Sequence, residues 1–219
     1  MLMAEAVPMD RRRRRRQESI EQVLDVAVEV MAELGVAGLT LGEVARRMGI
    51  RPPSLYVYFD GKNALYDALF ERGWRDLLTA MEAPEGGAPD GAVGADDVLR
   101  VSTALVRWCV EHPAYAPLMM WRPVPGFTPS ERAYAPAVEL ERRSRGFLSD
   151  LRDAGVLPPD ADLDLAFRTW TAVTSGVITQ QLSNAPAEPF ETGTFTSTLP
   201  DVMAMWLAHH GGRPNGTPD

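Results

Sequence analysis

The chain has 219 residues, of which 45% are hydrophobic, which is enough for one or two globular domains with a buried core and excludes a disordered chain. The net charge of −8 does not exclude a nucleic-acid partner, because residues 1–75 hold 12 basic and 11 acidic residues and the acidic excess follows them. The single cysteine excludes a disulfide scaffold, and the lack of an apolar run of about 18 residues excludes a membrane span. Because there is also no secretory-signal pattern, we expect a cytoplasmic protein.

The N-terminal segment is dominated by six consecutive arginines, Arg11–Arg16. A run of like charges repels itself and is typical of an unfolded tail, so we expect residues 1–16 to form a flexible arm. Two interpretations stay open at this point: a solvated tail, or an arm that touches DNA.

Two helices are expected next. Apolar residues at three- and four-residue spacing from Ile20 to Leu34 predict an amphipathic helix that ends at Gly35. Thr40 and Glu43 have the spacing of a capping box, which predicts the start of a second, short helix that ends near Gly49.

A third short helix begins at Pro52 or Pro53, three or four residues later, and the pair predicts a helix-turn-helix. Proline suits the first turn of a helix, whose unpaired N–H groups attract phosphate. The N–H and hydroxyl of Ser54 would then be available to an anion. Lys62 opens the following helix, where a cation is unfavourable unless an anion binds nearby.

The rest of the chain is also expected to be helical. Apolar patterning predicts helices at about 62–81, 96–112, 129–154, 162–183 and 198–209, with short proline-bounded pieces such as 114–121 and a Gly/Pro-rich loop at 82–96. Because no stretch has a convincing strand pattern, we predict an all-α fold.

Residues 39–69 resemble the DNA-binding domain of the TetR family of bacterial transcription regulators. Eleven positions match the family pattern in order and spacing: Thr40, Val44, Ala45, Gly49, Ile50, Leu55, Tyr56, Tyr58, Phe59, Lys62 and Leu65. Two positions depart from it. Gly42 stands where many members carry a longer side chain able to reach DNA, and Gly61 replaces the frequent Ser or Asn cap before Lys62.

The resemblance implies a role for each matching position in DNA binding. The phosphate contacts would be made by Thr40, Ser54, Tyr56 and Lys62. Base edges or the backbone would be met by Arg51, Pro52, Pro53, Val57 and Tyr58. The family organisation implies a flexible arm over 1–16, an N-terminal three-helix helix-turn-helix domain over 17–66, and a larger helical effector-binding and dimerisation domain over 67–219.

In the larger domain we expect an adaptable, mostly apolar effector pocket. The candidate lining residues are Trp108, Tyr115, Met119, Met120, Trp121, Phe127, Tyr134, Phe147 and Trp170. Ser175 stands where one subgroup of the family has His. The resemblance also implies that the helices at 162–183 and 198–209 form a homodimer interface. These apolar residues would lie at the interface or in the core: Leu163, Phe167, Trp170, Val173, Val177, Leu182, Leu199, Val202, Met203 and Trp206.

No catalytic set, metal site or cofactor site is recognisable in the sequence. Asp160, Asp162 and Asp164 mimic the start of a calcium loop, but Leu165 and Thr171 occupy the positions that need Gly and Glu. We therefore expect a ligand-responsive DNA-binding regulator rather than an enzyme. It would be a homodimeric repressor of a near-palindromic operator, released by a small hydrophobic or aromatic effector. An activator, a regulator without an effector, and a helical small-molecule-binding or membrane-associated scaffold are the alternatives.

Overall fold

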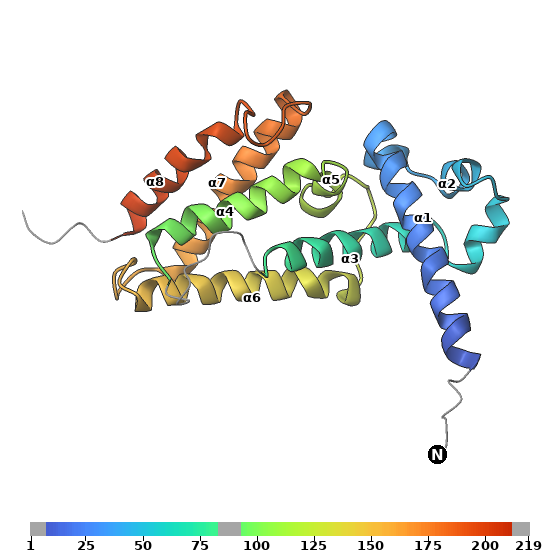
Figure 1. The fold of residues 1–219 in the computed structure, drawn as a ribbon, viewed down its shortest axis with the longest axis horizontal. Helices are drawn as coiled ribbons and strands as arrows, with labels where there is room; N and C mark the ends of the chain where they lie inside the picture. Colours follow the sequence, from blue (N-terminus) through green and yellow to red (C-terminus); the bar gives the residue numbers. More distant parts are fainter. Residues whose placement is uncertain (1–7, 83–92, 212–219) are drawn as a thin grey trace, which may run out of the picture.

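A computed structural model describes residues 8–82 and 93–211, and within these ranges every regular element is a helix (Figure 1). The elements are α1 (Pro8–Gly38), α2 (Leu41–Arg47), η1 (Pro52–Val57), α3 (Lys62–Ala80), α4 (Ala95–Glu111), α5 (Tyr115–Met120), α6 (Glu131–Asp153), α7 (Leu163–Asn184), η2 (Thr196–Thr198) and α8 (Leu199–His210), where η denotes a 3₁₀ helix. The predicted all-α fold is confirmed. Most of the loop expected at 82–96 lies outside the described residues.

Helix α1 begins earlier than the sequence pattern predicts. Arg11–Arg16 lie within it, so the expected flexible arm is wrong for this segment, and residues 1–7 lie outside the described residues. Arginine is a good helix former, and the pairing of Arg14 with Glu18 one turn later offsets part of the repulsion. At the other end, Gly35 has φ 72° and interrupts the helix at the predicted position.

The first hydrophobic core holds α1, α2, η1 and the start of α3 together. Leu39, Val44, Leu55 and Leu65 are completely buried in it. Gly49, with φ 66°, ends α2 and lets the chain turn towards η1, as a left-handed residue at a helix end does. These elements form the predicted helix-turn-helix at one end of the molecule (Figure 1).

The first core continues past the expected domain boundary at residue 66. It includes Leu69 and Phe70 of α3, Leu118 of α5 and Ala133 of α6. Helix α3 is continuous from Lys62 to Ala80 and lies beside α6 (Figure 1). The two domains therefore share one rigid element instead of meeting at a linker.

The second core lies among the far half of α3 and helices α4 to α8. Helix α4 packs against α7 and α8, and α6 packs against α3 and α7. Helix α5 approaches α3 closely at Gly73, where an added Cβ would lie 2.7 Å from both Met119 Sδ and Tyr115 Cδ1. Only glycine permits this approach, which fixes α5 between the two cores.

The two C-terminal helices bury much of the apolar surface that the sequence offered for dimerisation. Among the residues proposed for that surface, these are buried inside the chain: Trp170, Val177, Leu199, Met203 and Trp206. They belong to the core because α7 and α8 pack against α4. Leu165 and Met205 are 39% and 63% exposed, so they are the large apolar residues of α7 and α8 that face outwards.

Candidate nucleic-acid interface and ligand cavity

Helix η1 has one face in the core and one face in solvent. Leu55 is completely buried, and Phe59, just after η1, is 4% exposed. Tyr56 and Val57 are 59% and 71% exposed. Exposed apolar side chains that lie together beside polar groups are typical of interaction surfaces. The outer face of η1 is therefore a candidate binding edge.

The start of η1 differs from the predicted anion-binding helix end. Pro52 and Pro53 occupy its first two positions, as expected. However, η1 is a 3₁₀ helix, and the Ser54 N–H already donates to the Arg51 carbonyl at 2.9 Å. The i→i+3 bond of a 3₁₀ turn engages the donor that an α-helix would leave unpaired. What Ser54 offers a partner is its exposed hydroxyl side chain.

The predicted capping box forms on its threonine side. Thr40 is the N-cap of α2, and its hydroxyl accepts a hydrogen bond from the Glu43 N–H at 3.1 Å. The Glu43 carboxylate, which the capping box would direct back to Thr40, accepts hydrogen bonds from Arg46 and Arg47. Two arginines in the next turn attract the carboxylate more strongly than a neutral N–H does.

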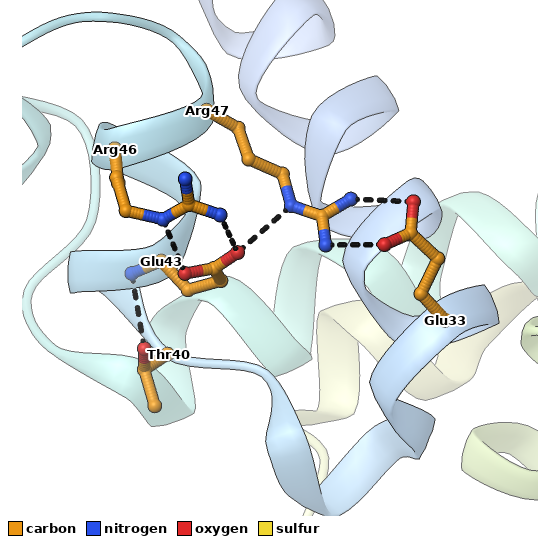
Figure 2. A network of polar contacts seen from close by, with 5 residues as sticks. All are labelled: Glu33, Thr40, Glu43, Arg46 and Arg47. Carbon is orange, nitrogen blue, oxygen red and sulfur yellow. Dashed lines mark hydrogen bonds and ion pairs between the residues drawn. The ribbon is translucent and has the colours of Figure 1, made fainter.

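These side chains form a network that joins α2 to α1 (Figure 2). Glu43 binds Arg46 through Nε at 2.9 Å and through NH2 at 2.6 Å, and it binds Arg47 Nε at 2.9 Å. Arg47 also makes two parallel hydrogen bonds to Glu33 of α1, at 2.8 and 2.7 Å. Hydrogen bonds from Arg46 and then Arg47 lower the pKa of Glu43 to about 2, so the carboxylate stays ionised.

Lys62 has partners within the chain. Its Nζ donates to the Ala37 carbonyl at 3.3 Å and lies 5.1 Å from the centre of the Tyr66 ring. The Tyr66 hydroxyl donates to the Val36 carbonyl at 2.6 Å. Lys62 and Tyr66 thus bind the end of α1 to the start of α3. Sequence reasoning assigned Lys62 to an anion alone and missed this role.

Arg16, the last residue of the arginine run, contacts the candidate edge. Its NH2 group donates to the Val57 carbonyl at 3.5 Å, and its guanidinium carbon lies 5.7 Å from the centre of the Tyr58 ring. The N-terminal extension of α1 that carries Arg11–Arg15 therefore begins its projection into solvent beside η1. Its position follows from a contact between residues 41 positions apart in the sequence, which no local pattern reveals.

The nine sequence-predicted DNA-binding residues are gathered at this end of the molecule. The exposed ones are Thr40, Arg51, Pro52, Pro53, Ser54, Tyr56 and Val57, and the partly buried ones are Tyr58 and Lys62. They surround η1 and the N-termini of α2 and α3. A duplex lying along η1 would find hydroxyls, one arginine and an apolar strip.

The larger domain holds a cavity of about 360 Å³. It is lined by Trp74, Met81, Leu105, Met120, Tyr134, Ala137, Leu140, Glu141, Ser144, Phe167, Trp170, Thr171, Thr174, Ser175 and Ile178. Met120, Tyr134 and Trp170 are the three members of this lining among the nine residues predicted for the effector pocket. The polar residues from α6 and α7, together with Trp74 of α3 and Met81 just after it, were missed, since apolar patterning does not show which side of a helix faces a cavity.

The other six predicted pocket residues do not line this cavity. Phe127 packs on Tyr66 and Phe70 near the first core, with ring centres 5.5 and 6.4 Å apart. Trp108 stacks on His112, at 4.5 Å between ring centres. Trp121 is 40% exposed. For these three residues the expectation is corrected, because packing against neighbours or solvent has taken up their rings.

Tyr115, Met119 and Phe147 contact other residues rather than the space of the cavity. Tyr115 and Met119 fill the close contact at Gly73. Phe147 lies 6.3 Å from Trp170 between ring centres, so it supports a lining residue from behind. They can affect a bound molecule by holding the wall in place.

The chemistry of the described residues outside these two sites is limited. Cys109 is buried, and burial raises the pKa of its thiol to about 12, which keeps it protonated. Residues 8–82 and 93–211 contain no group of three or more His, Cys, Asp or Glu side chains that could hold a metal ion. No helix in those ranges combines the length and apolar character that a membrane crossing requires.

Comparisons with known proteins match the fold and the helix-turn-helix segment. The family model described as bacterial regulatory proteins, tetR family, matches residues 23–69. The tetracycline repressor protein class C of Escherichia coli is 30% identical over 202 residues, which cover 88% of this chain and 82% of that protein. The HTH-type transcriptional regulator Rv1816 of Mycobacterium tuberculosis is 27% identical over 165 residues, 74% of this chain and 67% of that protein.

A solved structure with little sequence similarity has the same fold. The transcriptional regulator FadR from Bacillus subtilis, in complex with stearoyl-CoA, superposes with a TM-score of 0.70 at 16% identity, covering 86% of this chain and 97% of that one. The similarity extends over both domains, so the arrangement of helices around the cavity is shared as well as the helix-turn-helix.

Proposed function

Because the chain belongs to the TetR family of bacterial transcription regulators, we propose that it is a repressor that binds DNA through η1 and α2 and is released by a small apolar molecule in the cavity. The observation that carries the proposal is that η1 has one buried face and one exposed face. Leu55 anchors it in the core while Tyr56 and Val57 are left exposed. A short helix held in this way can enter the major groove of a duplex.

The residues of the edge would divide into phosphate contacts and base contacts. The hydroxyls of Thr40, Ser54 and Tyr56 suit phosphate oxygens, which position the protein on the duplex. Pro52, Pro53 and Val57 would meet thymine methyl groups, and Arg51 would supply hydrogen bonds to a base edge. Lys62 already donates one of its three N–H groups to the Ala37 carbonyl, which restricts its reach, so we assign it a secondary role in phosphate contact.

A dimer would place two such edges on one face of the duplex. Half-sites one helical turn apart require recognition helices about 34–36 Å apart, so the operator would be near-palindromic. The outward-facing Leu165 of α7 and Met205 of α8 would lie at the contact between two copies. A two-fold axis brings the same surface of each copy together.

The cavity suggests the chemistry of the effector. Its lining is mainly aromatic and aliphatic, with one carboxylate, Glu141, and no basic residue among the described lining residues. A ligand that depends on several phosphates, as an acyl-CoA does, would find no cation there. The Trp74 indole N–H is buried without a hydrogen-bond partner in the structure, so a ligand that displaced the side chains covering it would bond to it through a carbonyl or ether oxygen. We propose an uncharged aromatic or aliphatic molecule with such an acceptor.

Release would follow from a difference in ligand affinity between two arrangements of the dimer. Trp74 lines the cavity on the same continuous helix that begins at Lys62, beside the binding edge. A ligand that shifts this part of α3 would change the separation of the two edges. The DNA-bound arrangement would then be disfavoured by a free energy equal to the difference in the ligand's binding free energy between the two arrangements.

The proposal is tested by titrating a labelled duplex of the DNA upstream of the protein's own gene and following its anisotropy. Removing the Ser54 and Tyr56 hydroxyls together, as Ser54→Ala with Tyr56→Phe, is expected to weaken binding about tenfold per hydroxyl. A Ser144→Ala variant, altered at the cavity, is the matched control and should bind as the wild type does. Equal affinity of all three proteins would contradict the assigned edge, and no preference for any DNA would contradict the function.

The arginine extension is expected to strengthen binding through phosphates beside the half-site. Replacing Arg11–Arg15 with glutamine, while keeping Arg16, should weaken operator binding and reduce the slope of log K against log[salt] by about 0.9 for each phosphate that is no longer neutralised. Anisotropy titrations over a salt series give this slope. The same slope for both proteins would mean that the extension is a solvated helix end.

A further inference from the structure

We propose that Glu43 restrains Arg46 and Arg47 and thereby limits the binding of the helix-turn-helix to DNA of unrelated sequence. The inference rests on the proposed function, because it concerns the same edge. It assigns a specificity role to a residue that makes no base contact itself.

Both arginines of α2 are paired with carboxylates. Glu43 accepts three hydrogen bonds from Arg46 and Arg47, and Glu33 accepts two more from Arg47 (Figure 2). The four residues therefore carry two positive and two negative charges within hydrogen-bonding distance. These distances are well within the Debye length of about 10 Å at 0.1 M, so moderate salt weakens the pairs without abolishing them.

Arg46 stands on the outward face of α2, near the proposed phosphate contact at Thr40. It lies four residues after Gly42, and residues at this spacing share one face of a helix. A Cβ at Gly42 would have only the Thr40 hydroxyl within 4 Å, at 3.9 Å, so this face is open. Arg46 carries a long side chain on this open face, and its guanidinium is turned to Glu43 (Figure 2).

Restraining an arginine weakens binding to DNA of unrelated sequence more than it weakens binding to the operator. Binding to unrelated DNA comes almost entirely from phosphate contacts and counterion release, whereas operator binding also includes contacts with base edges. An arginine already paired with a carboxylate gains less from a phosphate, and the carboxylate repels that phosphate. Glu43 would therefore increase the ratio of operator affinity to unrelated affinity, which decides occupancy on a chromosome.

The alternative is that the network only fastens α2 to α1. Arg47 fits such a role, because it lies between Glu33 and Glu43 with its side chain 17% exposed. Arg46 does not, because its side chain is 69% exposed and its partner Glu43 is on its own helix. The Glu43–Arg46 pair lies within α2 and does not reach α1, so fastening does not account for Arg46, and restraint of its charge is the better explanation.

The test is Glu43→Gln, with binding to an operator duplex and to a duplex of unrelated sequence measured by anisotropy between about 50 and 300 mM salt. Glutamine keeps the size of the side chain and an acceptor oxygen but removes the charge. We expect unrelated DNA to bind several-fold more tightly at the lowest salt, with a salt slope steeper by about one to two, and the operator-to-unrelated ratio to fall.

Glu139→Gln is the matched control. Glu139 on α6 binds Arg142 and Arg143 at the same three- and four-residue spacing, with distances of 2.7 to 2.8 Å. Those two arginines lower the pKa of Glu139 to about 2, as their counterparts do for Glu43. The control frees Arg142 and leaves Arg143 with Glu82, just as Glu43→Gln frees Arg46 and leaves Arg47 with Glu33. The change lies away from the helix-turn-helix, and we expect no change in either affinity.

Two Arg46 variants complete the test. Arg46→Gln alone should change unrelated binding less than twofold, and added to Glu43→Gln it should remove most of the gain. The inference is overturned if folded Glu43→Gln binds unrelated DNA no more tightly than wild type, or if Glu139→Gln gains equally. A large loss of affinity for unrelated DNA in Arg46→Gln alone would also overturn the inference, because Arg46 would then already contact phosphates in the wild type. This result does not depend on whether Glu43→Gln folds. Wild type that binds no operator would sink the proposed function as well, whereas an unchanged ratio would sink this inference alone.

Discussion

Leu55→Ala is expected to lower the free energy of unfolding of the helix-turn-helix by about 2–5 kcal/mol and to abolish operator binding. Leu55 is completely buried and attaches η1 to the first core. A 3₁₀ helix of six residues has little stability of its own, so this anchor determines whether η1 keeps its position. Urea denaturation followed by circular dichroism, together with anisotropy on the operator duplex, measures both effects.

Val57→Ala separates anchoring from contact with DNA. Val57 lies two residues from Leu55 in the same helix but is 71% exposed. Its replacement should leave the free energy of unfolding within about 0.5 kcal/mol of wild type while weakening operator binding. If Leu55→Ala left both stability and binding unchanged, η1 would not be the element that orients the edge.

The helix-turn-helix could be predicted from sequence because its determinants are local. The Thr40 cap, the Gly49 helix end and the two prolines of η1 act within a few residues of themselves, and the structure has each of them. The pairing of Lys62 with Ala37 could not be read in this way, since it depends on how α1 and α3 meet. Long-range partners therefore changed the roles of residues whose positions were predicted well.

The cavity was less predictable for a physical reason. Aromatic and thioether residues suit a core and a binding wall equally well, so sequence patterns cannot separate the two. Phe127 packs beside the first core and Trp170 lines the cavity, although both are large aromatic residues of the kind that line binding pockets. The polar wall at Thr171 and Ser175 follows from the rotation of α7, which packing alone determines.

The connection between α7 and α8 is organised by one buried amide, and Gln181→Met is expected to destabilise the larger domain by about 2–5 kcal/mol. Gln181 is completely buried. Its Oε1 accepts from the N–H groups of Phe195 at 2.9 Å and Thr196 at 3.2 Å, and its Nε2 donates to the Ala185 carbonyl at 2.7 Å. Methionine has a similar volume but would leave all three backbone groups without these bonds.

The close packing around Gln181 leaves little space for a water molecule or another side chain to replace its hydrogen bonds. A Cβ at Gly193 would lie 2.8 Å from Gln181 Oε1, so the backbone here approaches the amide closely. For a domain of this size, about 3 kcal/mol corresponds to a fall in melting temperature of roughly 6–12 °C. Sedimentation of the variant would show whether the dimer proposed at α7 and α8 loosens with the connection between them.

Gln180→Met is the control for Gln181→Met. Gln180 is exposed, and its amide oxygen accepts only from Asn184 within α7. Surface substitutions of this kind change stability by less than about 0.5 kcal/mol. Melting curves for the two variants therefore compare adjacent glutamines on one helix. If Gln181→Met melted together with the control, water or a rearranged loop would be satisfying the three backbone groups, and the orientation of α8 would depend instead on the packing of Met203 and Trp206 against the core.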